Sequence, residues 1–190
     1  MLALTGLEQG AGYPFLEWYA GAGIGYQFRS ILKSHIENID PDKEHHLILA
    51  GGYEHYHTTK TGKVTREEHA VIEIDPGARP ISWLLLRDRN RIEFRWIDGA
   101  YSTRYRNEPS IEADATIHGY HFMPFGAAEA FYSGASRSWD EERYTAGAQW
   151  PYKDVLMLET YYRREHCPTC KPANWNVGGT TVHFYFRRAK

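Results

Sequence analysis

The sequence predicts an all-β fold, an antiparallel up-and-down transmembrane β-barrel with about 10–12 strands in the complete protein. Three observations support this prediction. Hydrophobic residues alternate with polar or small residues from Trp18 onward. Aromatic residues make up 15% of the chain, with 14 Tyr and 6 Trp, and such residues favour strands. Arginines concentrate in the alternating segments, whereas lysines fall between them.

Length and composition bound the classes of protein to consider. The chain has 190 residues, and we expect a single β-barrel domain over residues 1–190 with strands from about residue 18 to residue 186. The formal net charge of −2 gives no electrostatic reason to expect nucleic acid as a partner. A mean hydropathy of −0.59 and the lack of an apolar run of about 20 residues argue against transmembrane helices. These two observations are compatible with a membrane β-barrel, because only every second residue of its strands must be apolar.

The alternation divides the chain into candidate strands. In Tyr19–Phe28, one face carries alanines, Ile24 and aromatic residues, and the other carries three glycines and Gln27. Nine strands are predicted, and residues 29–44 and 165–174 are predicted as long loops. An odd number is unusual for a bacterial single-chain barrel, so we expect either a missing N-terminal strand or a wrong assignment near Arg29–Glu44, which could be a long loop with a short helix. The nine strands are Tyr19–Phe28, His46–His57, Arg66–Ile74, Trp83–Trp96, Tyr101–Ile117, His121–Tyr132, Asp140–Trp150, Val155–Arg164 and Asn174–Phe186.

Turn-forming residues separate these strands. Asp75-Pro76-Gly77 and Asp98-Gly99 are typical of tight turns. If the C-terminus faces the periplasm, the inner turns are Asp75–Pro80, Ile117–Tyr120 and Pro151–Asp154, and the outer loops are Ser133–Trp139 and His166–Ala173.

Alternation alone does not say which face points inward, because a soluble lipocalin-like barrel encloses its apolar face and a membrane barrel exposes it. The distribution of basic residues favours the membrane barrel. Arginine is preferred where a planar pair with a carboxylate is held away from bulk water. Arg89, Arg91, Glu93 and Arg95 share one strand face, whereas Tyr144, Ala146, Ala148 and Trp150 form an apolar band on another strand. The seven lysines lie in predicted connections or at the terminus: Lys33, Lys43, Lys60, Lys63, Lys153, Lys171 and Lys190.

These charged faces predict a network of arginines and carboxylates inside the barrel. It could form an anion-binding lumen or a structural plug, and we favour the plug because a narrow barrel has room for little more than its own side chains. The predicted network comprises Arg89, Arg91, Glu93, Arg95, Arg104, Arg106, Glu129, Arg143 and Glu159.

The two cysteines, Cys167 and Cys170, are a second candidate site. Their spacing also occurs in zinc sites and in thioredoxin-like redox sites. A zinc site needs two more ligands and His166 is the only close one, while a redox motif needs a helix that Pro172 and the following strand do not offer. In an exported protein we favour a small disulfide.

Two weaker candidates involve histidine. His55 and His57 share a strand face, as metal ligands could, and His45 and His46 begin the same strand, but an incidental polar rim is the simpler interpretation. Thr181 and His183 also share a face, which is the nearest arrangement to a nucleophile with its base. We expect no metal and no other cofactor.

Five parts of the sequence form a recognisable pattern: Arg89-Asn90-Arg91-Ile92-Glu93-Phe94-Arg95, Arg104-Tyr105-Arg106, Glu129-Ala130-Phe131-Tyr132, Arg143 and Val182-His183-Phe184-Tyr185-Phe186. Together they resemble an uncharacterised family of bacterial outer-membrane barrels known only as a domain of unknown function. The resemblance covers roughly Tyr19 to Phe186, and its most specific part is the paired arginine strands followed by the Glu-x-Phe-Tyr strand. It implies fold and location, but no activity.

The sequence departs from this pattern at both ends. Met1–Gly10 has no basic segment followed by a long apolar one, so no signal peptide is visible. Either the chain is mature or truncated at its N-terminus, or the membrane interpretation is wrong. Barrel chains commonly end on an aromatic residue, whereas Arg187–Lys190 follow Phe186 here.

We therefore expect an outer-membrane protein without enzymatic activity, either structural or a narrow or plugged channel for a small solute. Its expected partners are outer-membrane lipid and the barrel-assembly machinery. The alternatives are an outer-membrane lipid-modifying enzyme and a soluble lipocalin-like barrel that binds an apolar ligand.

Overall fold

A computed structural model describes residues 2–9, 15–29, 43, 45–60, 63–152, 155–168 and 173–184. The strands are β1 (Leu2–Gln9), β2 (Phe15–Arg29), β3 (His45–Lys60), β4 (Lys63–Ile81), β5 (Leu84–Ile97), β6 (Ala100–Ala113), β7 (Ala115–Ile117), β8 (Tyr120–Ser133), β9 (Ser138–Tyr152), β10 (Leu156–His166) and β11 (Asn174–Phe184). All eleven belong to one sheet, and every strand pairing in it is antiparallel.

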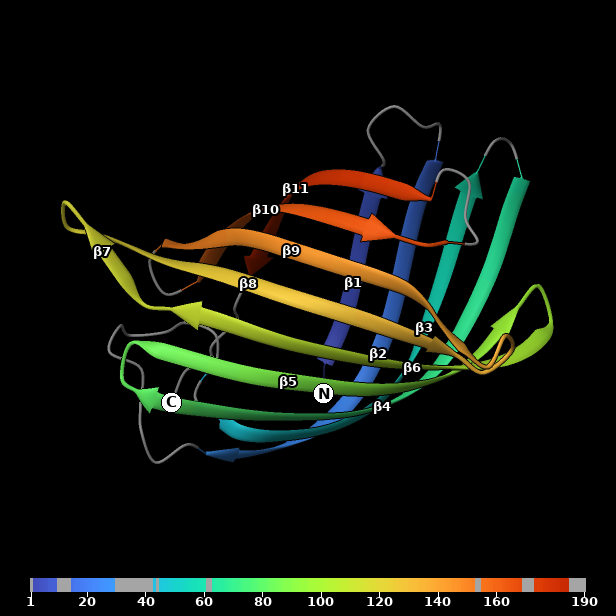
Figure 1. The fold of residues 1–190 in the computed structure, drawn as a ribbon, viewed down its shortest axis with the longest axis horizontal. Helices are drawn as coiled ribbons and strands as arrows, with labels where there is room; N and C mark the ends of the chain where they lie inside the picture. The colour runs from blue at the N-terminus through green and yellow to red at the C-terminus, as the bar shows by residue number, and fades with distance from the viewer. Residues whose placement is uncertain are drawn as a thin grey trace.

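The sheet has the up-and-down order that the sequence predicts. Ten strands follow one another as β1-β2-β3-β4-β5-β6-β8-β9-β10-β11, and β7 pairs with β8 beside this path. The predicted all-β, antiparallel, up-and-down fold is therefore confirmed. Within the described residues, β1 and β11 each pair with one neighbour and not with each other, so the sheet is open between them. Figure 1 shows that the sheet is strongly curled, which gives it a concave and a convex face.

Two rims limit the strands. The C-terminal rim contains the end of β11 at Phe184, the turn Ser82–Trp83 between β4 and β5, and the turn His118–Gly119 between β7 and β8. The opposite rim contains Asp98–Gly99 and the turn of residues 134–137. The predicted turns at Asp98-Gly99 and within Ile117–Tyr120 are confirmed. Both have two consecutive positive φ angles, 48° and 85° at Asp98 and Gly99 and 51° and 81° at His118 and Gly119, as in type I′ hairpins.

The number of strands and the bounds of several of them differ from the prediction. The structure adds β1, which the alternation does not indicate, and this gives the main path an even number of strands. The predicted first strand, Tyr19–Phe28, begins earlier, at Phe15. The predicted loop 165–174 begins later, because β10 continues to His166. Most of the predicted loop 29–44 lies outside the described residues, and so does the chain after Phe184.

The predicted turn at Asp75-Pro76-Gly77 is wrong, because β4 continues through it to Ile81. Asp75 and Pro76 pair in register with β3, and the Asp75 carboxylate binds Arg87 of β5 on the concave face. The pairing with β5 becomes irregular between Ala78 and Ile81, where Pro80 has no N–H to donate. A tertiary ion pair and a local irregularity thus extend a strand through a turn-like sequence.

The predicted strand Tyr101–Ile117 is also divided. Asp114 interrupts it between β6 and β7. Its backbone N–H donates to the carbonyl of Trp83 at 2.7 Å, and its carboxylate lies 3.5 Å from Arg79. The side chains of Asp114 and Arg79 are almost fully buried, so this ion pair accounts for the interruption between β6 and β7.

Candidate functional site: a layer of buried ion pairs

The concave face carries most of the buried charge. On β5, period two places Arg89, Arg91, Glu93 and Arg95 on this face, opposite carboxylates and arginines of β4 and β6. The described buried polar side chains outnumber the buried hydrophobic ones. The buried hydrophobic residues are Ile48, Val71, Leu85, Met123, Phe131 and Met157, and the buried polar or charged residues are Lys43, Glu54, His69, Asp75, Arg79, Glu93, Glu129 and Glu165.

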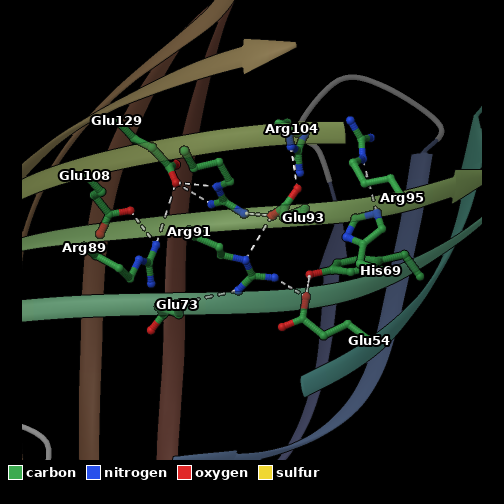
Figure 2. A network of polar contacts seen from close by, with 12 residues as sticks. Glu54, His69, Glu73, Arg89, Arg91, Glu93, Arg95, Arg104, Glu108 and Glu129 are labelled. Carbon is green, nitrogen blue, oxygen red and sulfur yellow. Dashed lines mark hydrogen bonds and ion pairs between the residues drawn. The ribbon is translucent and has the colours of Figure 1, made fainter. Parts of the chain in front are cut away.

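Glu93 lies at the centre of one group of ion pairs. It is 0% exposed. Arg104 Nε donates to Glu93 Oε2 at 2.6 Å, and Arg106 Nη1 donates to Glu93 Oε1 at 2.9 Å. Arg91 Nε lies 3.0 Å from the same Oε1. The strand register explains this grouping, because Glu93 lies directly opposite Arg104 and Arg91 lies opposite Arg106. Figure 2 shows Arg91 and Arg104 converging on Glu93.

Glu129 on β8 is the second centre. Arg106 Nε donates to Glu129 Oε1 at 2.7 Å, so Arg106 bridges the two carboxylates. Arg89 Nη2 lies 3.7 Å from Glu129 and donates to Glu108 at 2.6 Å. Arg143 lies opposite Glu129 in register, with Nη1 3.9 Å from Oε2. Glu129 therefore joins arginines from β5, β6 and β9.

Phe131 packs within this set of arginines. Its side chain is 0% exposed. The guanidinium carbons of Arg104, Arg106 and Arg143 lie 5.1, 4.9 and 4.6 Å from the ring centroid. These distances place all three within reach of a cation–π interaction. The ring also occupies space that would otherwise admit water beside the guanidinium groups.

We call these seven charged residues the ion-pair layer: Arg89, Arg91, Glu93, Arg104, Arg106, Glu129 and Arg143. They are seven of the nine residues that the sequence predicts as a network. Arg95 pairs instead with Glu67 at 3.0 Å, next to His69, and Glu159 lies near the C-terminal rim. Further contacts extend the layer sideways, from Glu54 on β3, which binds Arg91, to Glu165 on β10, which lies 3.5 Å from Arg143.

A second charged group, missed by the sequence analysis, surrounds Lys43. Its Nζ lies 2.5 Å from Glu112 and also binds Gln149, although these partners are far apart in sequence. Gln149 in turn donates to Glu159 at 2.7 Å, and His183 Nε2 lies 3.6 Å from Glu159. The ammonium group of a residue in a predicted loop is thus buried between β6 and β9 near the C-terminal rim. No local pattern marks this contact.

Two cavities lie between the ion-pair layer and the C-terminal rim. One, of about 460 Å³, lies between the inner faces of β2–β4 and Arg87, Arg89 and Arg91 of β5. The other, of about 530 Å³, includes Lys43 and residues of β5 to β11 in its lining. They share Arg87, Arg89, Glu108 and Ser110, and so adjoin each other.

Glycines form part of the wall of the first cavity. Gly23 and Gly25 carry no side chain into it, as the small face of the first predicted strand suggests. A Cβ at Gly23 would lie 2.9 Å from the carbonyl oxygen of Gly51, so glycine permits the close approach of β2 and β3. The concave side therefore has two levels: the ion-pair layer fills one, and the two cavities occupy the next, toward the C-terminal rim.

The remaining predicted sites lie apart from this layer. Cys167 is disulfide-bonded, and its predicted partner Cys170 lies outside the described residues, so the pairing stays a prediction. His55 lies 3.9 Å from Glu68, and His57 belongs to the same face of β3. Thr181 pairs in register with Glu159 on the concave side.

The residues that the structure describes contain no group of three or more His, Cys, Asp or Glu side chains that could hold a metal ion. They also contain no helix long and apolar enough to cross a membrane.

Comparison with known proteins identifies a family. Residues 39–176 match the model of a family described as protein of unknown function (DUF2490). The match covers more than half of the chain and includes every member of the ion-pair layer. No curated protein and no solved structure matches the chain.

Proposed function

We propose that this chain, which belongs to the DUF2490 family of proteins of unknown function, is an outer-membrane β-barrel closed internally by its ion-pair layer. In this proposal the ten-stranded sheet completes a barrel in the membrane, and the charged layer blocks the lumen. The role is structural, or that of a plugged channel, in the bacterial envelope. The sequence resemblance to outer-membrane barrels supports the location.

The inverted distribution of apolar and charged side chains carries the proposal. Among the described residues, 25 large hydrophobic side chains are exposed and only six hydrophobic side chains are buried. Ile24 is 75% exposed, and Ile72 and Ile92 are 53% and 44% exposed in the middle of their strands. Soluble proteins rarely expose large apolar patches, so this distribution is unusual for a protein surrounded by water. Lipid around the convex face would cover it without cost, as in membrane barrels.

Aromatic side chains near both rims agree with a membrane-spanning orientation. Trp83 and Tyr120 lie at the C-terminal rim, and Trp96 and Tyr101 lie near the opposite rim, with ring centroids 5.5 Å apart. Trp83 and Trp96 are 13 residues apart in sequence. At about 3.3 Å per residue and a tilt of about 40°, they span roughly 33 Å along a barrel axis. This is close to the ~30 Å hydrocarbon thickness of a bilayer.

The balance of charges favours a plug over an anion-selective pore. Among the described residues, the ion pairs of the concave face include more carboxylates than Lys and Arg side chains, so these pairs offer no excess of positive charge to an anion. Most members of these pairs are buried or half-buried. The pairs involve Lys43, Arg79, Arg87, Arg89, Arg91, Arg95, Arg104, Arg106, Arg143 and Arg163, and Glu54, Glu67, Glu73, Asp75, Glu93, Glu108, Glu112, Asp114, Glu129, Glu141, Glu159 and Glu165.

The two alternative functions have less support. A lipocalin-like barrel for an apolar ligand needs an apolar interior, whereas both cavities on the concave side have arginines and carboxylates among their lining residues. A lipid-modifying enzyme needs its nucleophile within reach of lipid, whereas Thr181 faces the concave side and lines a cavity. Neither observation favours these functions over a structural barrel.

Envelope fractionation followed by electrophoresis with and without boiling tests the location and the fold. We expect the protein in the outer-membrane fraction, with a compact band that shifts after boiling. Purified protein in planar bilayers then tests the plug, and we expect no steady conductance. An aqueous protein without a band shift would refute the membrane barrel, and a stable open conductance would refute the plug.

A further inference from the structure

A cluster of polar side chains interrupts the apolar convex face. We call Asp88, Asn90, Tyr105 and Asn107 the convex polar cluster. Asn107 Nδ2 donates to Asp88 Oδ1 at 2.6 Å and to Asn90 Oδ1 at 3.2 Å. The Tyr105 hydroxyl donates to Asn90 Oδ1 at 2.5 Å. Asn90 and Asn107 lie directly opposite each other in the pairing of β5 with β6, so the cluster is held by the strand register.

The cluster lies midway between the two aromatic rims. On the convex face of β5, Asp88 follows Trp83 by five residues, and Asn90 precedes Trp96 by six. Exposed Leu86 and Ile92 flank the polar pair on either side along the strand. In the proposed orientation this position is near the middle of the hydrocarbon layer, where a carboxylate and amides are expensive to expose to lipid. Polar residues at such depth usually face water or another protein.

Small residues adjoin the cluster on the next strand of the main path. Ala130 lies opposite Asn107, and Gly126 lies opposite Ile111. A Cβ on Gly126 would meet no atom closer than 3.9 Å, so packing within the chain does not require glycine there. Ala128 lies between these two positions on the same face. Beside the cluster, the side chains on the convex surface are therefore small, and a neighbouring backbone could approach this surface closely.

The hydrogen bonds within the cluster leave both acceptor and donor capacity at its surface. The Asp88 carboxylate has a second oxygen beyond the one that accepts from Asn107. Asn90 Nδ2 donates one hydrogen to the Asp88 carbonyl at 2.7 Å and carries a second one. Around a two-fold axis near the cluster, Asn90 of each copy could donate its spare hydrogen to the spare oxygen of Asp88 in the other copy. One surface thus supplies both halves of a contact, as an isologous dimer interface requires.

We propose that the convex polar cluster and the small residues of β8 beside it are the contact surface for a second copy of this chain within the membrane. This inference rests on the proposed membrane location. Pairing would remove the carboxylate and the amides from lipid and satisfy their remaining hydrogen-bonding capacity. The exposed apolar remainder of the convex face would still contact lipid.

The test compares two variants in membranes. In Asp88→Leu/Asn90→Leu/Asn107→Leu, the cluster becomes apolar. The matched control is Thr160→Leu/Thr180→Leu, which makes an outward pair on β10 and β11 apolar at positions that are also opposite in register. We expect cross-linking in native membranes, and mass measurement after detergent extraction, to show a dimer for the wild-type protein and the control. For the cluster variant we expect at least a tenfold loss of dimer, with the heat-dependent band shift retained.

Each other outcome has a distinct meaning. Monomeric wild-type protein in the membrane, or a cluster variant that dimerises as well as the control, would overturn the interface while leaving the membrane barrel intact. A cross-linked species of a different mass that the cluster variant loses would show another protein at this surface, and would also overturn the second copy as its occupant. A protein in the aqueous fraction would overturn the proposed function and this inference together.

Discussion

Replacing Glu93 by glutamine probes the ion-pair layer at its most buried point. The substitution preserves the size of the side chain and removes its charge. Glu93 is 0% exposed and lies within 3.0 Å of guanidinium nitrogens from Arg91, Arg104 and Arg106. A glutamine can accept hydrogen bonds through one oxygen only, and its amide nitrogen would face an arginine donor. The three cations would then share one fewer buried negative charge.

The expected cost follows from these contacts. Removing one partner from a buried ion pair destabilises a protein by about 3–5 kcal/mol. Glu129 still neutralises Arg106, which it contacts at 2.5 Å, so we expect the lower part of this range. With a urea dependence of about 2 kcal/mol per molar, a loss of about 3 kcal/mol lowers the unfolding midpoint by about 1.5 M.

Equilibrium unfolding in urea, followed by tryptophan fluorescence of the protein in lipid vesicles, measures this shift. Glu68→Gln is the matched control, since Glu68 lies 3.9 Å from His55 and its side chain is 42% exposed. We expect the control to change stability by less than about 0.5 kcal/mol. If Glu93→Gln unfolds at the same urea concentration as the control, the ion pairs around Glu93 are not buried in the folded protein and our account of the layer is wrong.

Three further changes have defined expected results. Phe131→Leu removes the ring that lies 4.6–5.1 Å from three guanidinium carbons, so we expect a loss of about 2 kcal/mol in the same urea titration. If Phe131→Leu were as stable as the wild-type protein, the aromatic ring would contribute no more to stability than a leucine side chain does. Gly99→Ala places a side chain at a φ of +85° in open space, and we expect a loss of about 1 kcal/mol from backbone strain alone. Gly178→Ala also meets nothing within 4 Å but has no positive φ, so it should leave stability almost unchanged, and equal losses in the two variants would contradict the strain argument. For Cys167 and Cys170, mass spectrometry after alkylation should show no labelling until a reductant is added, and free thiols in the exported protein would exclude the disulfide.

Local periodicity made much of the concave face predictable. Alternation along one strand places Arg89, Arg91 and Glu93 together, and no distant residue is needed to see this. The preference of arginine for paired, poorly hydrated positions then separates the charged face from the apolar one. The same reasoning identifies the outward face of β9, where Tyr144 and Trp150 are exposed. The fold class and most of the ion-pair layer therefore depend on signals within ten residues or so of each other.

Contacts between distant residues explain what the sequence did not predict. Lys43 binds Glu112 and Gln149, which are 69 and 106 residues further along the chain. Asp75 carries a turn signal locally, but Arg87 of the next strand holds it on the concave face of β4. The sequence of β1, Leu2–Gln9, does not alternate cleanly between apolar and polar residues, so no local pattern marks this strand. For Lys43 and Asp75 the deciding contact is with a residue distant in the sequence, and for β1 the local pattern itself is missing.

The contact of the convex face with lipid is the central claim, and a spin label on it tests that claim most directly. The label is attached to Ile24→Cys on β2, which is 75% exposed and lies away from the convex polar cluster, and to Ala135→Cys in the turn at the opposite rim, each in protein reconstituted into a bilayer. Collision rates with oxygen, which concentrates in lipid, and with a water-soluble nickel chelate are then compared by electron paramagnetic resonance. We predict that oxygen dominates at position 24 and the nickel chelate at position 135. If position 24 meets the nickel chelate as often as position 135 does, the apolar convex face lies in water and the membrane barrel is contradicted.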